Sequence, residues 1–180
     1  MENKIKPKLL IFDCFNLTIG VNAVANHVNK DAEQIGMYLG TLNVLRTVID
    51  RIKPERVFCC YDGPEAGARR RELFKEYKDR RRVKSRLSVI KIHEDENKTT
   101  EYIQRGSFEQ QLGKIYGFSK LLPIQNFVIP GCEADDVIAY SALRYKNDFD
   151  VYIVSRDKDY LQLISQGIKV YNWKTKKLYD

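Results

Sequence analysis

Four short apolar runs stand out along the chain, and acidic residues follow each of them. The runs cover residues 9–12, 57–61, 127–129 and 151–154. Continuous runs of this length are typical of strands that are buried on both faces of a parallel sheet. The acids that come within a few residues after them number seven: Asp13, Asp62, Glu133, Asp135, Asp136, Asp157 and Asp159. Because ligands of an open parallel sheet bind beyond the carboxyl ends of its strands, we expect these acids to converge on one place.

Helix-like stretches alternate with these runs. Apolar residues at three- and four-residue steps predict a helix from Asp31 to Arg51, and Ser107 is a candidate N-cap for a helix ending near Gly117. Further helices are expected over Cys132 to Tyr145 and, shorter, over Asp157 to Ile164, followed by a strand from Ile168 to Trp173. This alternation predicts an α/β fold with a central, mainly parallel sheet flanked by helices.

Length and composition indicate one globular domain. The chain has 180 residues, of which 43% are hydrophobic and 11% aromatic. The apolar run behind the amino-terminal lysines is too short for a signal sequence or a membrane span, so we expect a cytoplasmic protein with no membrane partner. The 4 cysteines form no C-x-x-C pair and the 2 histidines are far apart, which favours reduced, buried thiols over a zinc site.

Positive charge is concentrated in one segment. The net charge is +7, and the stretch from Arg69 to Arg86 alone holds ten basic residues against three acidic ones. A solvated helix with internal ion pairs is the simpler alternative, but three acids cannot pair with ten bases. We therefore expect this stretch to bind a polyanion, within a segment of about residues 63–106 that projects from the core. Tyr77 fits either a core position or a base-stacking platform.

The acids themselves favour hard divalent cations. Carboxylate oxygens without nearby histidines suit Mg²⁺ or Mn²⁺. Helix capping is the alternative for each acid taken alone, notably for Asp157 and Asp159. Three acids between residues 133 and 136 exceed what one helix start requires, and they favour metal binding. No Ser-His-Asp or Cys-His arrangement and no Gly-rich phosphate loop is visible.

Several of these blocks together resemble the bacteriophage and bacterial 5′→3′ exonuclease and flap endonuclease family, which includes the 5′-nuclease domain of DNA polymerase I. The blocks follow the family's order over nearly the whole chain: Leu-Ile-Phe-Asp13 with Asn16, Tyr-Asp62-Gly63, the Arg-rich run into Tyr77-Lys78-Asp79-Arg80-Arg81, Gly131-Cys-Glu-Ala-Asp-Asp, and Val-Ser-Arg-Asp157-Lys-Asp159. The resemblance implies a PIN-like nuclease core with two divalent ions, Mg²⁺ or Mn²⁺, and a helical arch formed by the basic segment.

The resemblance also implies roles for individual residues. Asp157 and Asp159 are expected at the second metal ion, and the remaining acids named above at the first. Lys78 and Arg81 are expected to reach the scissile phosphate from the base of the arch. The other basic residues of the arch are expected to bind nucleic acid, together with Tyr77: Arg69, Arg70, Arg71, Lys75, Arg80, Arg82, Lys84 and Arg86.

The chain departs from the family's pattern after its last strand. The family's Gly-Asp-x-x-Asp-Asn block, and its helix-hairpin-helix region that grips duplex DNA, do not occur before Asp180, and the resemblance therefore leads us to expect a second metal site that lacks two carboxylates. We expect residues 1–180 to be the catalytic core of a truncated or split nuclease, or of one completed by a second polypeptide. If a phage encodes it, the host cytoplasm is its place.

The function expected from these observations is metal-dependent hydrolysis of DNA at a 5′ end or 5′ flap, in replication or repair, with RNA 5′ ends as an alternative substrate. A compact PIN-type ribonuclease is the second hypothesis, and a non-catalytic nucleic-acid-binding module is the third. The basic arch argues against the ribonuclease, and metal-dependent cleavage separates both enzymes from the binding module.

Overall fold

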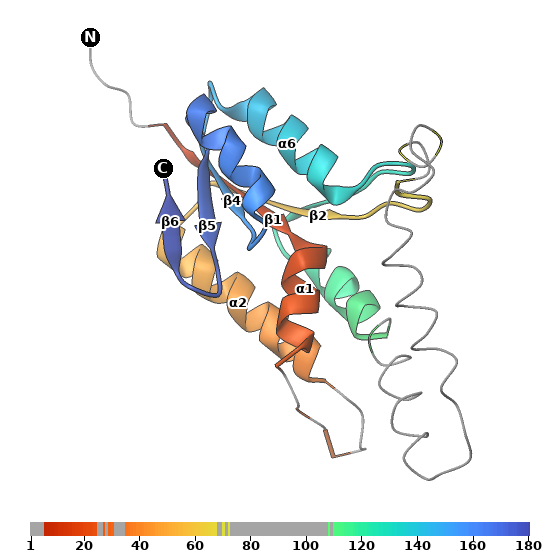
Figure 1. Ribbon diagram of the computed structural model, residues 1–180. Helices are drawn as coiled ribbons and strands as arrows, with labels where there is room; N and C mark the ends of the chain where they lie inside the picture. The colour runs from red at the N-terminus through yellow and green to blue at the C-terminus, as the bar shows by residue number, and fades with distance from the viewer. Residues whose placement is uncertain are drawn as a thin grey trace.

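A sheet of six strands forms the centre of the described part of the chain (Figure 1). The structure is a computed structural model that describes residues 6–24, 27, 29–30, 35–67, 70, 72, 108 and 110–180. The strands lie in the order β3-β2-β1-β4-β5-β6. The chain therefore starts in the middle of the sheet, and the later strands are added on both sides.

The strands are parallel except at one edge. β1 (Lys8–Asp13) pairs in parallel with β2 (Arg56–Tyr61) and with β4 (Asp150–Val154). β3 (Gln125–Val128) lies parallel to β2, and β5 (Lys169–Asn172) lies parallel to β4. The short β6 (Lys177–Tyr179) pairs antiparallel with β5. The expected mainly parallel sheet is confirmed. Because β1, β2 and β4 are parallel, their carboxyl ends lie at the same end of the sheet.

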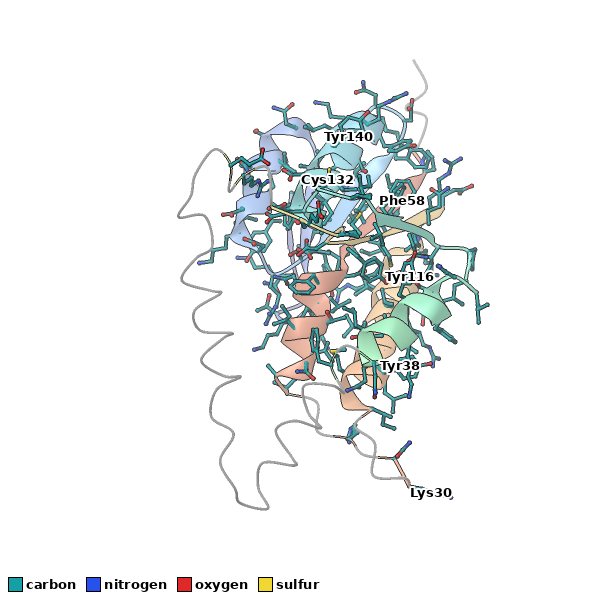
Figure 2. The ribbon with its side chains drawn as sticks, turned by 90° about the vertical axis from the view of Figure 1, so that its right-hand side faces the viewer. Lys30, Tyr38, Phe58, Tyr116, Cys132 and Tyr140 are labelled. Atoms are coloured by element: carbon teal, nitrogen blue, oxygen red, sulfur yellow. The ribbon has the colours of Figure 1, made fainter. Side chains whose placement is uncertain are left out.

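Helices cover both faces of this sheet. α1 (Cys14–Asn22), α2 (Gly36–Ile52) and a helix over residues 110–119 pack on one face. α6 (Ala134–Tyr145) and the 3-10 helix η1 (Lys158–Gln166) pack on the other. Figure 2 shows Tyr116 and Tyr38 on the side of the first group, with Tyr140 and Cys132 on the side of α6. The result is a three-layer α/β arrangement.

The central strand β1 explains how both layers are held. Its residues are buried on alternate faces, with Leu10 and Phe12 in the cluster under α1 and α2, and Leu9 and Ile11 in the cluster under α6. All four side chains are 0% exposed. Burying one such side chain contributes about 1.5–3 kcal/mol to the stability of the fold. Strand β1 therefore stabilises the packing of helices on both faces of the sheet.

Most expected elements are present, with small shifts of their ends. The expected helix from Cys132 begins at Ala134, and the short helix near Asp157 is a 3-10 helix from Lys158 to Gln166. Helix α1 was not predicted, because its residues Phe15 to Val21 alternate between apolar and small or polar side chains as a strand would. Strand β6 was not predicted either, because it has only 3 residues.

The cysteines and the helix lengths also bear on the sequence-based expectations. Cys14, Cys59 and Cys60 are buried and Cys132 is half-buried, and all of these thiols are free. The expectation of reduced thiols is thus met. Among the residues that the structure describes, no helix is both long and apolar enough to cross a bilayer.

Candidate metal and nucleic-acid site

Carboxylates from four separate places in the sequence line one cavity at the carboxyl edge of the sheet. The cavity has a volume of about 260 Å³. Its acidic lining residues are Asp13, Asp62, Glu133, Asp135, Asp157 and Asp159. Asp136 is not among the lining residues, although it is linked to two of them through Arg70. The convergence that the strand-end pattern predicted is therefore present.

Asp13 lies at the buried centre of this site, as the last residue of β1. One carboxylate oxygen caps α1 by accepting from the backbone N–H of Asn16 at 3.0 Å. The other accepts from the hydroxyl groups of Ser155 at 3.1 Å and Tyr160 at 3.2 Å. Burial raises the pKa of the Asp13 carboxyl above its ordinary value, the three hydrogen bonds lower it, and the nearby charge of Asp62 raises it further.

Asp62 reaches the start of α6 because hydrogen bonds join the loop after β2 to the loop before α6. Its Oδ1 accepts from the backbone N–H of Ala134 at 2.8 Å, so Asp62 caps a helix 72 residues away in sequence. The neighbouring residue Gly63 donates its N–H to the carbonyl of Cys132 at 3.0 Å. Gly131 donates in turn to the carbonyl of Pro64 at 2.8 Å. These hydrogen bonds place Asp62 beside the carboxylates of α6.

The carboxylates at the start of α6 surround the guanidinium of Arg70. Nη1 of Arg70 lies 2.6 Å from Oε2 of Glu133 and 3.5 Å from Oδ2 of Asp135, and Nη2 pairs with Asp136. Burial raises the pKa of Asp135, Arg70 lowers it, and the neighbouring carboxylates Asp136 and Glu133 raise it. Arg70 was expected to bind nucleic acid, and its place within the acidic cluster was not predicted.

The loop after β4 joins the second pair of acids to Asp13. Asp157 accepts from the backbone N–H of Asp159 at 3.0 Å and thereby caps η1. Its own N–H donates to the hydroxyl of Ser155 at 3.1 Å, and that hydroxyl donates to Asp13. The hydroxyl of Ser155 thus links Asp13, in the first predicted group of metal ligands, to Asp157 in the second.

Capping and metal binding do not exclude each other at this site. The hydrogen bonds that cap helices from Asp62 and Asp157 each use one of two carboxylate oxygens, Oδ1 in both cases. The capping alternative considered for these acids is therefore real, and it also orients the carboxylates toward the cavity that they line.

The donor set fits a hard divalent ion. The acidic lining residues offer only oxygen ligands, and none of the described residues that line the cavity is a histidine. The guanidinium of Arg70 pairs with three of the predicted acidic ligands, so a positive charge is already accommodated among them. Within the described ranges, no group of three or more His, Cys, Asp or Glu side chains is close enough together to hold a metal ion in the present arrangement.

Three side chains that shape the site were not among the predicted site residues. Ser155 and Tyr160 hold Asp13, and Arg156 lines the cavity. Ser155 and Arg156 stand immediately before Asp157, so proximity to a predicted ligand was the available signal. Tyr160 follows Asp159 directly and gave the same signal.

The predicted arch residues other than Arg70 lie outside the described residues. These are Arg69, Arg71, Lys75, Tyr77, Lys78, Arg80, Arg81, Arg82, Lys84 and Arg86. Their expected roles in catalysis and nucleic-acid binding stay predictions, and so does the arch over about residues 63–106.

Comparison with known proteins assigns the chain to a family. Residues 8–180 match the family described as 5'-3' exonuclease, N-terminal resolvase-like domain. The chain is 32% identical over 135 residues to a 5'-3' exonuclease of Aquifex aeolicus, covering 74% of this chain and 39% of that protein. It is 25% identical over 173 residues to a 5'-3' exonuclease of Buchnera aphidicola, covering 95% of this chain and 53% of that protein.

A solved structure agrees with the fold. Bacteriophage T5 flap endonuclease, crystallised with DNA and metal ions, superimposes with a TM-score of 0.72 at 20% identity, covering 96% of this chain and 57% of the phage protein. This likeness supports the PIN-like α/β core expected from the sequence. The chain spans between 39% and 57% of the length of these proteins. With a match over residues 8–180, the chain belongs to the 5'-3' exonuclease family through its N-terminal resolvase-like domain.

Proposed function

We propose that this chain is the metal-binding core of a 5′→3′ exonuclease or 5′-flap endonuclease that hydrolyses phosphodiester bonds in DNA. The observation that carries the proposal is the single cavity lined by acids from the ends of three parallel strands and the start of α6. The two relatives described above are named 5'-3' exonucleases, and the phage neighbour is a flap endonuclease in complex with DNA.

Two groups of acids are proposed to hold two divalent ions. The first consists of Asp13 and Asp62 with the three acids around the start of α6, and the second of Asp157 and Asp159. Mg²⁺ or Mn²⁺ is proposed because all of these ligands are hard oxygen donors. Divalent ions, when bound there, supply the positive charge that stabilises charge developing on a reacting phosphate.

The chain's own residues prepare this site. Ser155 and Tyr160 hold the Asp13 carboxylate in place, and Asp62 is held by the helix start that it caps. Lys78 and Arg81 are proposed to neutralise charge on the scissile phosphate from the arch. The rest of the basic segment is proposed to hold a single-stranded 5′ end. A cytoplasmic location stays a prediction.

Cleavage of matched substrates tests the proposal. Labelled 5′-flap DNA, single-stranded DNA and single-stranded RNA of the same sequence are incubated with the chain, with and without Mg²⁺ or Mn²⁺. We expect the parent chain to cleave DNA from the 5′ side when a metal ion is present. Asp135→Asn should abolish this cleavage. Asp148→Asn is the matched control, because Asp148 is exposed and precedes β4 at the opposite edge of the sheet.

Each alternative has its own outcome in this experiment. Cleavage of RNA without cleavage of DNA would favour the compact ribonuclease. Binding of DNA without cleavage at any metal concentration would favour the non-catalytic module. Activity that appears only when a second polypeptide is added would support a split nuclease.

A further inference from the structure

One cation in the acidic cavity is not engaged by the acids. Arg156 is the basic residue among the cavity's described lining residues, and it directly precedes Asp157. Arg70 is paired with three carboxylates, whereas Arg156 forms no ion pair with any carboxylate in the part of the chain that the structure describes. The two arginines near this site therefore differ in what neutralises them.

Neutral groups hold the side chain of Arg156. Its guanidinium lies over the indole of Trp173, with Cζ 5.1 Å from the ring centroid. The amide oxygen of Asn16 accepts from the backbone N–H of Arg156 at 3.2 Å and from Nε at 3.5 Å. A π face and an amide oxygen orient a guanidinium without cancelling its charge, and the terminal N–H groups can still bind an anion.

A glycine provides the space for this arrangement. A Cβ built on Gly20 of α1 would lie 2.6 Å from Cζ of Arg156 and 2.7 Å from Cζ2 of Trp173. The guanidinium and the indole thus pack directly on the helix backbone at Gly20. Arg156 is fixed between α1 and the turn that joins β5 to β6, at the rim of the carboxylate site.

We propose that Arg156, seated on Gly20 and Trp173, binds a backbone phosphate of the DNA strand next to the phosphate that is cleaved. This rests on the proposed function. Six carboxylates line the cavity, so an approaching polyanion is repelled wherever no cation faces it. A guanidinium that is held in place and is not paired with an acid supplies a charge-assisted contact at low entropic cost.

Binding without cleavage tests the inference separately from the proposed function. The affinity of the chain for a 5′ single-stranded oligonucleotide is measured in EDTA and in Ca²⁺ over a range of salt concentrations. We expect Arg156→Ala to weaken binding about tenfold and to lower the salt slope by about one phosphate contact. Arg156→Lys should keep most of the slope, because the charge remains.

A second measurement locates the contact. Methylphosphonate groups neutralise one phosphate of the oligonucleotide at a time, and we expect one such position to weaken binding to the parent chain while leaving binding to Arg156→Ala unchanged. Arg46→Ala is the control for net charge, because Arg46 is 82% exposed on α2. It should leave the affinity within about twofold of the parent value.

Gly20→Ala tests the seat, since it keeps the charge and displaces the guanidinium. We expect it to lose a substantial part of the affinity that Arg156→Ala loses. An affinity equal to that of the parent would show that the seat does not position the cation. An unchanged salt slope and an unchanged methylphosphonate profile for Arg156→Ala would overturn the inference, as would a parent chain that fails to bind at low salt. Binding as expected, with no cleavage in Mg²⁺ or Mn²⁺, would overturn only the proposed function.

Discussion

Arg70 donates from Nη1 to Oε2 of Glu133 at 2.6 Å, in a place where the Glu133 side chain is only 5% exposed. A buried carboxylate needs such a partner, because removing one member of a buried pair leaves the other charge without compensation. The same guanidinium also pairs with Asp136. Arg70 therefore stabilises the carboxylates of this site, and under the proposed function divalent ions would have to displace it from the same oxygens.

Arg70→Ala should separate these two effects. We expect the metal-free protein to lose about 1–3 kcal/mol of stability, and we expect Mn²⁺ to bind more tightly than to the parent chain, since no guanidinium has to be displaced. Thermal unfolding in EDTA measures the first effect and calorimetric titration with Mn²⁺ measures the second. Arg46→Ala serves as the control. Weaker Mn²⁺ binding by Arg70→Ala would show that the two cations do not compete.

Asp13→Asn should raise stability and abolish cleavage. The pKa of Asp13 is raised in the folded chain, so the folded state binds the proton more tightly than the unfolded state. Its unfavourable contribution therefore grows as the pH rises from about 3.9, the ordinary value, through the raised value, and is constant above it. The gain of the Asn variant should be on the order of 1 kcal/mol at neutral pH, or roughly 2–4 °C in Tm.

The pH dependence gives the control for this prediction. As the pH falls below about 4, the parent Asp13 becomes protonated in both states, and the stability difference from the Asn variant should disappear. Asp148→Asn, an exposed position that precedes β4, is the control for the loss of one negative charge and should change the stability at neutral pH by less than about 0.5 kcal/mol. A gain that stayed constant from neutral to acidic pH would contradict the assignment to Asp13 ionisation.

The positions of the acids could be predicted because they follow the ends of continuous apolar runs that read as buried parallel strands. Val57 to Tyr61 is a continuous apolar run, so the sheet edge that receives Asp62 was readable from the sequence. The interpretation of each acid as either a cap or a ligand could not be decided in the same way. Asp62 caps α6 across 72 residues, and a contact at that separation leaves no local pattern.

The partners of the two arginines were not predictable for the same reason. Arg70 was grouped with its basic neighbours, because sequence proximity suggested one common surface. Its pairing with Glu133, 63 residues away in sequence, depends on the contact between the loop after β2 and the loop before α6. Arg156 had no role in the sequence-based prediction. Its stacking on Trp173 requires β4 and β5 to be adjacent, which the local sequence does not show.

Lys78→Ala and Arg81→Ala should lower turnover more than affinity. A cation aimed at the reacting phosphate acts mainly in the transition state, so we expect a loss of about 100-fold in kcat with Kd within about threefold of the parent value. Single-turnover cleavage and equilibrium binding in Ca²⁺ measure the two quantities. Arg69→Ala and Lys84→Ala are the comparison, since these should weaken binding and flatten its salt dependence. Four variants that changed affinity alone would leave the arch without a catalytic role.

Gly63→Ala should disrupt the site through the backbone. A Cβ on Gly63 would lie 1.8 Å from the carbonyl oxygen of Ile129, and backbone on both sides prevents an easy adjustment. The loops after β2 and β3 would have to separate, which would move Asp62 away from the N–H of Ala134. We expect a loss of stability of about 1–3 kcal/mol together with weaker metal binding. Denaturant unfolding and Mn²⁺ titration measure both changes.

Gly113→Ala is the matched control for that variant, because it adds the same methyl group in the helix over residues 110–119, where a Cβ would meet nothing within 4 Å. An alanine there should raise stability by about 0.5–1 kcal/mol through helix propensity and should leave metal affinity unchanged. The two variants should therefore move stability in opposite directions. If Gly63→Ala bound Mn²⁺ as tightly as the parent chain while losing stability, the loop contact would support the fold without positioning Asp62, and the first group of metal ligands would have to be held by β1 and α6 alone.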